Sequence, residues 1–191
     1  MKNASLSSRP ESWDVTESGF ENPTFSGRVG FRPNEAWNFG LSASEGPYFT
    51  RQAEPTLPPG RGLDDFREFV LGQDASFAWR HLQVWAEVYE ARFEVPTVGD
   101  ADTLAYYVEA KYKFSPQFFG AIRWNQQLFA TLNDGNGHNA HWSPDLERID
   151  LAAGYRFTSH IQLKVQYSFQ HETTTPGNDN HLVAAQLTTR F

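Results

Sequence analysis

The chain has 191 residues, a formal net charge of −7 at pH 7, no cysteine and 15% aromatic residues. The lack of cysteine excludes a disulfide framework, a thiol nucleophile and any Cys-ligated metal site. The acidic balance argues against nucleic acid as a partner, because phosphate binding needs a basic surface. With a mean hydropathy of −0.57 and no apolar run near ~18 residues, no transmembrane helix is expected.

From residue 24 onward, apolar residues recur at every second position, which is the period of a half-buried strand. Most of these runs have the length that a tilted strand needs to cross a bilayer, and they exceed the ~5–6 residues usual in soluble proteins. The pattern predicts an all-β fold, an antiparallel up-and-down transmembrane β-barrel domain over 23–191, with 1–22 as a separate surface segment. About nine strands are visible, over 25–32, 37–44, 69–80, 83–89, 103–114, 118–127, 148–157, 161–170 and 183–191.

The connections between these runs alternate in length, as expected for a membrane barrel with short turns at one edge and long loops at the other. The tight connections are near 33–35, 80–82, 115–117 and 158–160, and the long ones are near 46–67, 95–101, 130–146 and 172–180. In the longest loop, over 45–72, the segment 63–70 is expected to form a short helical turn. We expect this loop to be a solvated surface loop rather than an inward constriction.

In the predicted strands, alternate positions carry mainly apolar residues and the positions between them carry mainly polar residues; we call these two sets the apolar and the polar parity. Aromatic side chains on the apolar parity gather beside the tight turns, where a membrane barrel has an interfacial girdle. The predicted girdle residues are Phe31, Trp37, Trp79, Phe114, Phe118 and Phe157. Alternation alone does not decide whether the apolar parity faces lipid or a protein core. Aromatic packing at one end of a soluble β-sandwich is therefore the alternative interpretation.

The polar parity is rich in basic residues, although the chain as a whole is acidic. A basic residue facing lipid at the bilayer midplane costs about 2–4 kcal/mol, so this parity is predicted to line a lumen. The predicted lumen-lining residues are Arg28, Arg80, Glu87, Glu109, Lys111, Lys113, Arg123, Arg148, Asp150, Arg156, Lys164 and Arg190. Such a wall favours anions, unless its cations simply pair with acids across strands, as Glu109 and Arg123 could.

No arrangement of residues points to catalysis or to a metal. His138 and His141 form an HxxH pair in a loop without a third ligand, and Ser168 with His171 lacks an acid to orient the histidine. We therefore expect no enzyme activity, no cofactor and no metal site.

The terminal run Val183-Ala-Ala-Gln-Leu-Thr-Thr-Arg-Phe191, which ends on phenylalanine, resembles the last strand of Gram-negative outer-membrane β-barrel proteins. Segments such as Val108-Glu-Ala-Lys-Tyr-Lys-Phe-Ser-Pro116 are similar in style to hairpins of general and phosphate-selective porins. The resemblance implies an outer-membrane location and contact with membrane lipid and lipopolysaccharide. It also implies that the barrel-assembly machinery recognises Val183, Ala185, Leu187 and Phe191. A homotrimer is one assembly that the resemblance allows.

The sequence departs from this family in two respects. Family members carry a signal peptide and close with an even number of strands, whereas we read nine strands and no signal-peptide pattern in this sequence. We therefore hypothesise that the chain is the C-terminal part of a larger barrel, with 1–22 a surface-loop remnant. The expected function is passive diffusion of small hydrophilic solutes, with anions as a candidate class. The alternatives are a non-conducting scaffold or adhesin barrel and a soluble lipocalin-like binding barrel.

Overall fold

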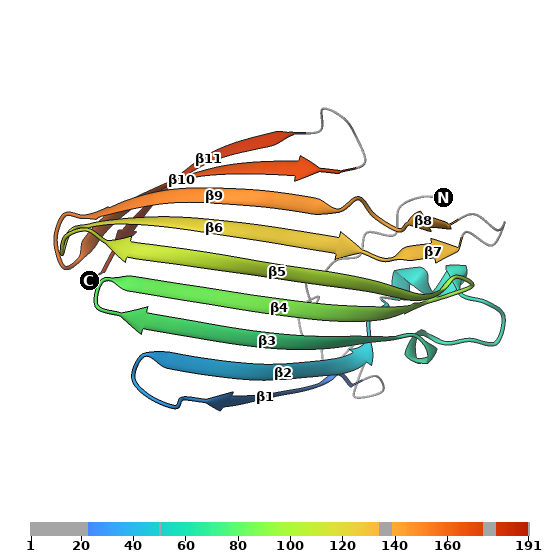
Figure 1. Ribbon diagram of the computed structural model, residues 1–191. Coiled ribbons are helices and arrows are strands. Elements are labelled where there is room, and N and C mark those ends of the chain that lie inside the picture. Colours follow the sequence, from blue (N-terminus) through green and yellow to red (C-terminus); the bar gives the residue numbers. More distant parts are fainter. Residues whose placement is uncertain (1–22, 50, 134–138, 174–178, 191) are drawn as a thin grey trace.

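The computed structural model describes residues 23–49, 51–133, 139–173 and 179–190, and most of this part is a single curved sheet (Figure 1). Nine strands pair in the order β1-β2-β3-β4-β5-β6-β9-β10-β11, each antiparallel to its neighbours in the sheet. Their bounds are β1 Phe25–Phe31, β2 Trp37–Pro47, β3 Arg67–Trp79, β4 Leu82–Val95, β5 Gly99–Lys113, β6 Phe118–Phe129, β9 Leu146–Arg156, β10 Ile161–Glu172 and β11 Asn180–Thr189. The all-β, up-and-down architecture predicted from the alternation is confirmed.

Small elements occupy the long-loop side. The strands β7 (Thr131–Asn133) and β8 (Asn139–His141) form a separate hairpin between β6 and β9. Two 3-10 helices, η1 (Arg51–Thr56) and η2 (Leu63–Asp65), lie between β2 and β3. The helical turn expected over 63–70 is thus limited to its first three residues, because the chain from Arg67 onward already pairs with β2. In the described residues no helix has the length and apolar character needed to span a membrane.

One predicted connection is wrong. The segment 95–101 was expected to be a long loop, but β4 and β5 pair as far as Val95 and Gly99, so only three residues separate the strands. Positive φ angles at Thr97 (65°) and Gly99 (100°) allow the chain to reverse this tightly. The strict alternation of short and long connections fails here, and the two strands extend further on the long-loop side.

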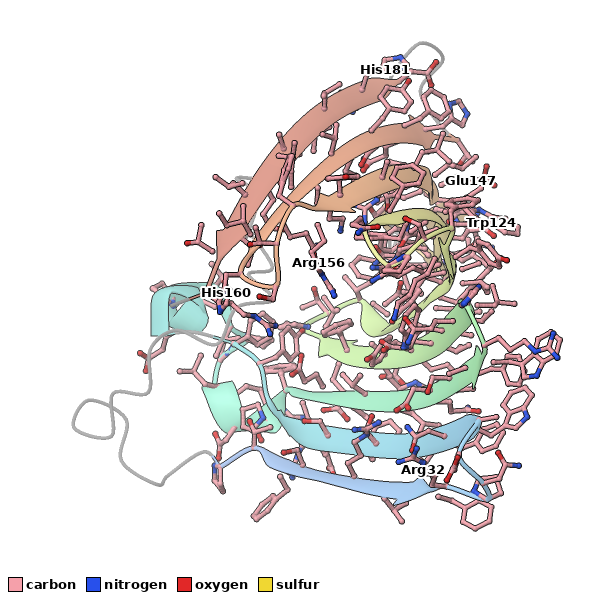
Figure 2. All side chains as sticks on the ribbon, turned by 90° about the vertical axis from the view of Figure 1, so that its left-hand side faces the viewer. Arg32, Trp124, Glu147, Arg156, His160 and His181 are labelled. Carbon is pink, nitrogen blue, oxygen red and sulfur yellow. The ribbon has the colours of Figure 1, made fainter. Side chains whose placement is uncertain are left out.

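The sheet bends into an arc whose two edges, β1 and β11, are not paired with each other (Figure 2). With nine strands in up-and-down order, β1 and β11 both run from the long-loop side toward the tight turns. An all-antiparallel barrel that contains this arc would need an odd number of strands between the two edges.

Candidate functional site: the concave face of the sheet

The curvature gives the sheet two distinct faces, and labelled side chains identify them. Arg156 points into the hollow of the arc, whereas Trp124 points away from it (Figure 2). Directly paired residues share a face, and successive residues in a strand alternate between faces. The register then places the following predicted lumen residues on the concave face: Arg28, Glu87, Glu109, Lys111, Lys113, Arg123, Arg148, Asp150, Arg156 and Lys164. Arg190 follows β11 with the same parity and donates its backbone N–H to the His160 carbonyl.

Arg80 is an exception among the predicted lumen residues. It occupies the β3–β4 turn with a positive φ of 52°. Its guanidinium carbon lies 4.6 Å from the centroid of the Trp79 ring, whose side chain belongs to the convex parity. The turn geometry therefore places this cation at the edge of the wall instead of on it.

The convex face carries the apolar parity, and its side chains are exposed. Phe39 is 40% exposed and Val108 is 47% exposed. In the described part of the chain, only Ala101 and Phe129 are buried hydrophobic residues. A soluble barrel would place its apolar parity in a core, so the soluble lipocalin-like and sandwich interpretations are not supported.

The apolar surface has the height of a bilayer's hydrocarbon layer. Along β5 and the residue after it, this surface extends from Leu104 to Phe114, which is about 33 Å of extended chain at ~3.3 Å per residue. A tilt of about 40° reduces this to a height of roughly 25 Å, the height of the apolar band of membrane barrels. Beyond Leu104 the convex face becomes charged, because Asp102 accepts hydrogen bonds of 2.8 and 3.0 Å from Arg92.

The predicted girdle residues all lie beside the tight turns and are exposed. Trp37 stacks on Phe39 and contacts Phe77, and Phe114 stacks on Phe118 with ring centroids 5.4 Å apart. The exposed fractions are 67% for Phe31, 40% for Trp37, 56% for Trp79, 63% for Phe114, 41% for Phe118 and 56% for Phe157. Polar side chains interrupt the convex face farther from the turns, where Gln126 accepts from the Tyr106 hydroxyl and donates to Glu147 at 3.1 Å, and where the Tyr167 hydroxyl lies 2.7 Å from Nδ1 of His181.

At mid-height the concave face holds three cations, each within 4 Å of an acid, and a fourth acid, Glu87, that accepts a hydrogen bond from Tyr89; we call the charged residues the paired band. Its members are Arg28, Asp74, Glu87, Glu109, Arg123, Arg148 and Asp150. The Arg123 guanidinium lies 3.7 Å from Glu109 and 3.6 Å from the centroid of the Tyr107 ring. The ion pair that the sequence offered as an alternative to free lumen charge is therefore present.

Asp150 anchors the paired band in β9. Its side chain is only 8% exposed and lies 3.3 Å from the Arg148 guanidinium. Asn125 donates to Oδ2 of the same carboxylate at 3.0 Å, and Gln166 donates to Oδ1 at 3.4 Å. A buried carboxylate needs such partners, so these contacts tie β6, β9 and β10 together on the lumen side.

Toward the tight turns, the concave face holds Lys111, Lys113, Arg156 and Lys164, which we call the basic band. Lys113 and Arg156 are the last residues of β5 and β9. Residues that are directly paired across neighbouring strands form a row that runs across the sheet. The basic band lies on the same face as the paired band but in rows nearer the tight turns.

On the long-loop side, the connection between β2 and β3 is anchored to the rim instead of being fully solvated. The Tyr48 hydroxyl donates to the Glu94 carbonyl oxygen at 2.8 Å, and the Tyr48 ring packs edge-on against Phe93, with centroids 5.3 Å apart. Burial, and then the carboxylates of Glu68 and Glu94, raise the pKa of Tyr48. The hydroxyl therefore stays protonated and remains a donor.

The terminal strand presents the predicted assembly residues outward. Val183, Ala185 and Leu187 lie on the convex parity of β11, and Val183 and Leu187 are 71% and 64% exposed. Phe191 and residues 1–22 fall outside the described part of the chain. So does His138, while Nδ1 of His141 lies 2.6 Å from the carbonyl oxygen of Phe129. Within the residues described, no group of three or more metal-ligating side chains is present.

No protein-family model and no curated protein sequence matches the chain. Solved structures do match. OmpF of Salmonella typhi, in complex with daunomycin, aligns with a TM-score of 0.61 and 16% identity over 85% of this chain and 49% of that one. OmpT, an outer membrane protein of Vibrio cholerae, aligns with a TM-score of 0.60 and 14% identity over 88% of this chain and 52% of that one. The chain thus has the fold of outer-membrane β-barrel proteins and spans about half the length of these two.

Proposed function

We propose that the protein acts in the outer membrane as a porin-like channel, through which small hydrophilic solutes diffuse passively, with a preference for anions. The observation that carries this proposal is the sorting of side chains between the two faces. The convex face exposes residues such as Val108, while the concave face carries charged residues such as Arg156. In a membrane barrel this arrangement puts the apolar face in lipid and the charged face around water.

The preference for anions follows from the charges that remain after pairing. Arg28, Arg123 and Arg148 are offset by Asp74, Glu109 and Asp150, each within 4 Å. Glu87 then remains as one negative charge, and the four cations of the basic band outnumber it. Fixed positive charge on a narrow aqueous wall concentrates anions.

Planar-bilayer recording tests this proposal. The detergent-purified protein is expected to insert in discrete conductance steps, with a reversal potential in a KCl gradient that is shifted toward the chloride equilibrium potential. Absence of conductance from correctly inserted protein would favour the non-conducting scaffold barrel. A potential shifted toward potassium would rule out the anion preference while leaving the channel in place.

A further inference from the structure

The concave face carries two bands of cations, and they differ in whether acids accompany them. Reading across the paired strands, one row contains Glu109, Arg123 and Asp150. The next three rows toward the tight turns contain no acidic residue over β4, β5, β6, β9, β10 and β11. They hold the basic band: Lys111 in the first row, Lys113 and Lys164 in the second and Arg156 in the third.

Within the described ranges, none of these four cations forms an ion pair or a hydrogen bond with a carboxylate. The nearest acid along the strand, Glu109, lies 3.7 Å from the Arg123 guanidinium and is shared with it. Lys113, Lys164 and Arg156 all lie within electrostatic reach of Lys111, and so does the Glu109 carboxylate. The basic band, with four cations near one shared carboxylate, is thus a local excess of positive charge, whereas the paired band has three cations and four acids.

Phe119 and Gly154 hold one of these charges in place without neutralising it. They are directly paired in β6 and β9, and the Phe119 ring covers Gly154 so closely that a Cβ there would overlap the ring. The Lys111 ammonium lies 4.1 Å from the centroid of that ring. A cation–π contact orients an ammonium but leaves its charge available to an anion.

The curvature of the sheet lets the four side chains converge. Lys113 and Lys164 lie in one row, with Phe119 and Gly154 between them, so their backbones are about 14 Å apart at ~4.8 Å per strand. Both project from the inner side of the arc, where flexible four-carbon stems can close much of this distance. Arg156 points into the same hollow from β9 (Figure 2).

The geometry points to a binding site in the basic band for a small, multiply charged oxyanion, at the tight-turn end of the lumen. Several cations on a curved wall act together on a multivalent ion, whereas chloride engages them singly. A guanidinium adds two parallel N–H donors that match a phosphate group. The inference rests on the proposed channel function for the route by which an anion reaches the site.

The position of the basic band predicts that block by a multivalent anion depends on the side of the membrane from which the anion is added. An anion entering from the tight-turn mouth meets the basic band first, whereas one entering from the long-loop mouth must first pass the paired band. A multivalent anion should therefore block the channel more strongly from the tight-turn side.

Titration calorimetry of the detergent-solubilised protein with inorganic pyrophosphate tests the site without requiring conductance. We expect saturable binding that weakens as KCl rises and that weakens at least tenfold in the K113Q/K164Q variant. The K113R/K164R variant should bind as the parent does, and so should R61Q, which removes one charge from the loop between β2 and β3. Absence of binding by the parent protein, or equal binding by K113Q/K164Q and the parent, would overturn the inference.

Channel recording then separates the inference from the proposed function. Pyrophosphate added on the tight-turn side should block the KCl current at a concentration at least threefold lower than on the other side. Equal block from both sides would overturn the one-sided site even if the channel conducts. Binding without any conductance would contradict the channel function and leave the anion site standing.

Discussion

Arg28 of β1 reaches Asp74 of β3 across the intervening strand, with its Nη2 atom 2.6 Å from Oδ1 of the carboxylate. The space for this ion pair is provided by Gly40 of β2, because a Cβ at Gly40 would lie 2.7 Å from Arg28 Nη2 and would also collide with the Asp74 carboxylate. A glycine on the lumen face thus allows a charge pair to join two strands that are not neighbours.

The Asp74→Asn substitution should make the channel more selective for anions. It removes the carboxylate that offsets Arg28, so one further positive charge acts on the lumen. We expect the anion-to-cation permeability ratio to rise roughly twofold, as measured from reversal potentials in a salt gradient. Gly40→Ala is the matched control, since it separates the same two groups without changing the lumen's net charge. A ratio that falls in Asp74→Asn would contradict the assignment of Arg28 to the lumen.

Gly154→Ala should destabilise the sheet, because the new methyl group would overlap the Phe119 ring. Overpacking of this kind costs about 1–3 kcal/mol, and we expect a lower thermal unfolding temperature in detergent. Gly27→Ala serves as the control, since no atom lies within 4 Å of a Cβ at that strand position. The double variant Gly154→Ala with Phe119→Leu should recover part of the loss. An unfolding temperature unchanged by Gly154→Ala alone would show that the ring does not need its place over Gly154.

Ile122→Arg and Ala121→Arg differ by one position in β6 but place the guanidinium on opposite faces. Ile122 is 53% exposed on the convex face, where an arginine near the bilayer midplane costs about 2–4 kcal/mol. Ala121 pairs with Lys111 on the concave face, where an arginine would face water. We expect folding into lipid vesicles, followed by heat-modifiable gel migration, to fail or slow strongly only for Ile122→Arg. Equal folding of the two variants would contradict the assignment of the faces.

Much of the fold could be predicted because alternation fixes both the strand and its faces. The run around Val108 and Glu109 is an example, since hydrophobic and charged positions alternate strictly from Val108 to Lys113. The turn at 96–98 was not predictable in the same way. Pro96 and Gly99 are typical of loops, and only the positive φ angles of Thr97 and Gly99 make the reversal tight.

The sequence could predict which face of the sheet carries the charged residues, but not which cations have an acid partner. Parity alone put Arg28 and Lys113 on the same wall, and the structure gives an acid partner to Arg28 only. That difference depends on strand register, because Asp74 comes opposite Gly40 and within reach of β1. Register is set by turn geometry and by packing along whole strands, and neither can be read from a local pattern of residues.

Site-directed labelling along β5 tests the assignment of the two faces most directly. The chain contains no cysteine, so single substitutions Val108→Cys, Glu109→Cys, Ala110→Cys and Lys111→Cys each introduce a unique thiol. In lipid vesicles, positions 109 and 111 should react with a membrane-impermeant maleimide. A fluorophore attached before folding at positions 108 and 110 should be quenched by a lipid-embedded quencher. The reverse pattern, or a native fold in plain buffer with positions 108 and 110 shielded from every reagent, would contradict the membrane barrel.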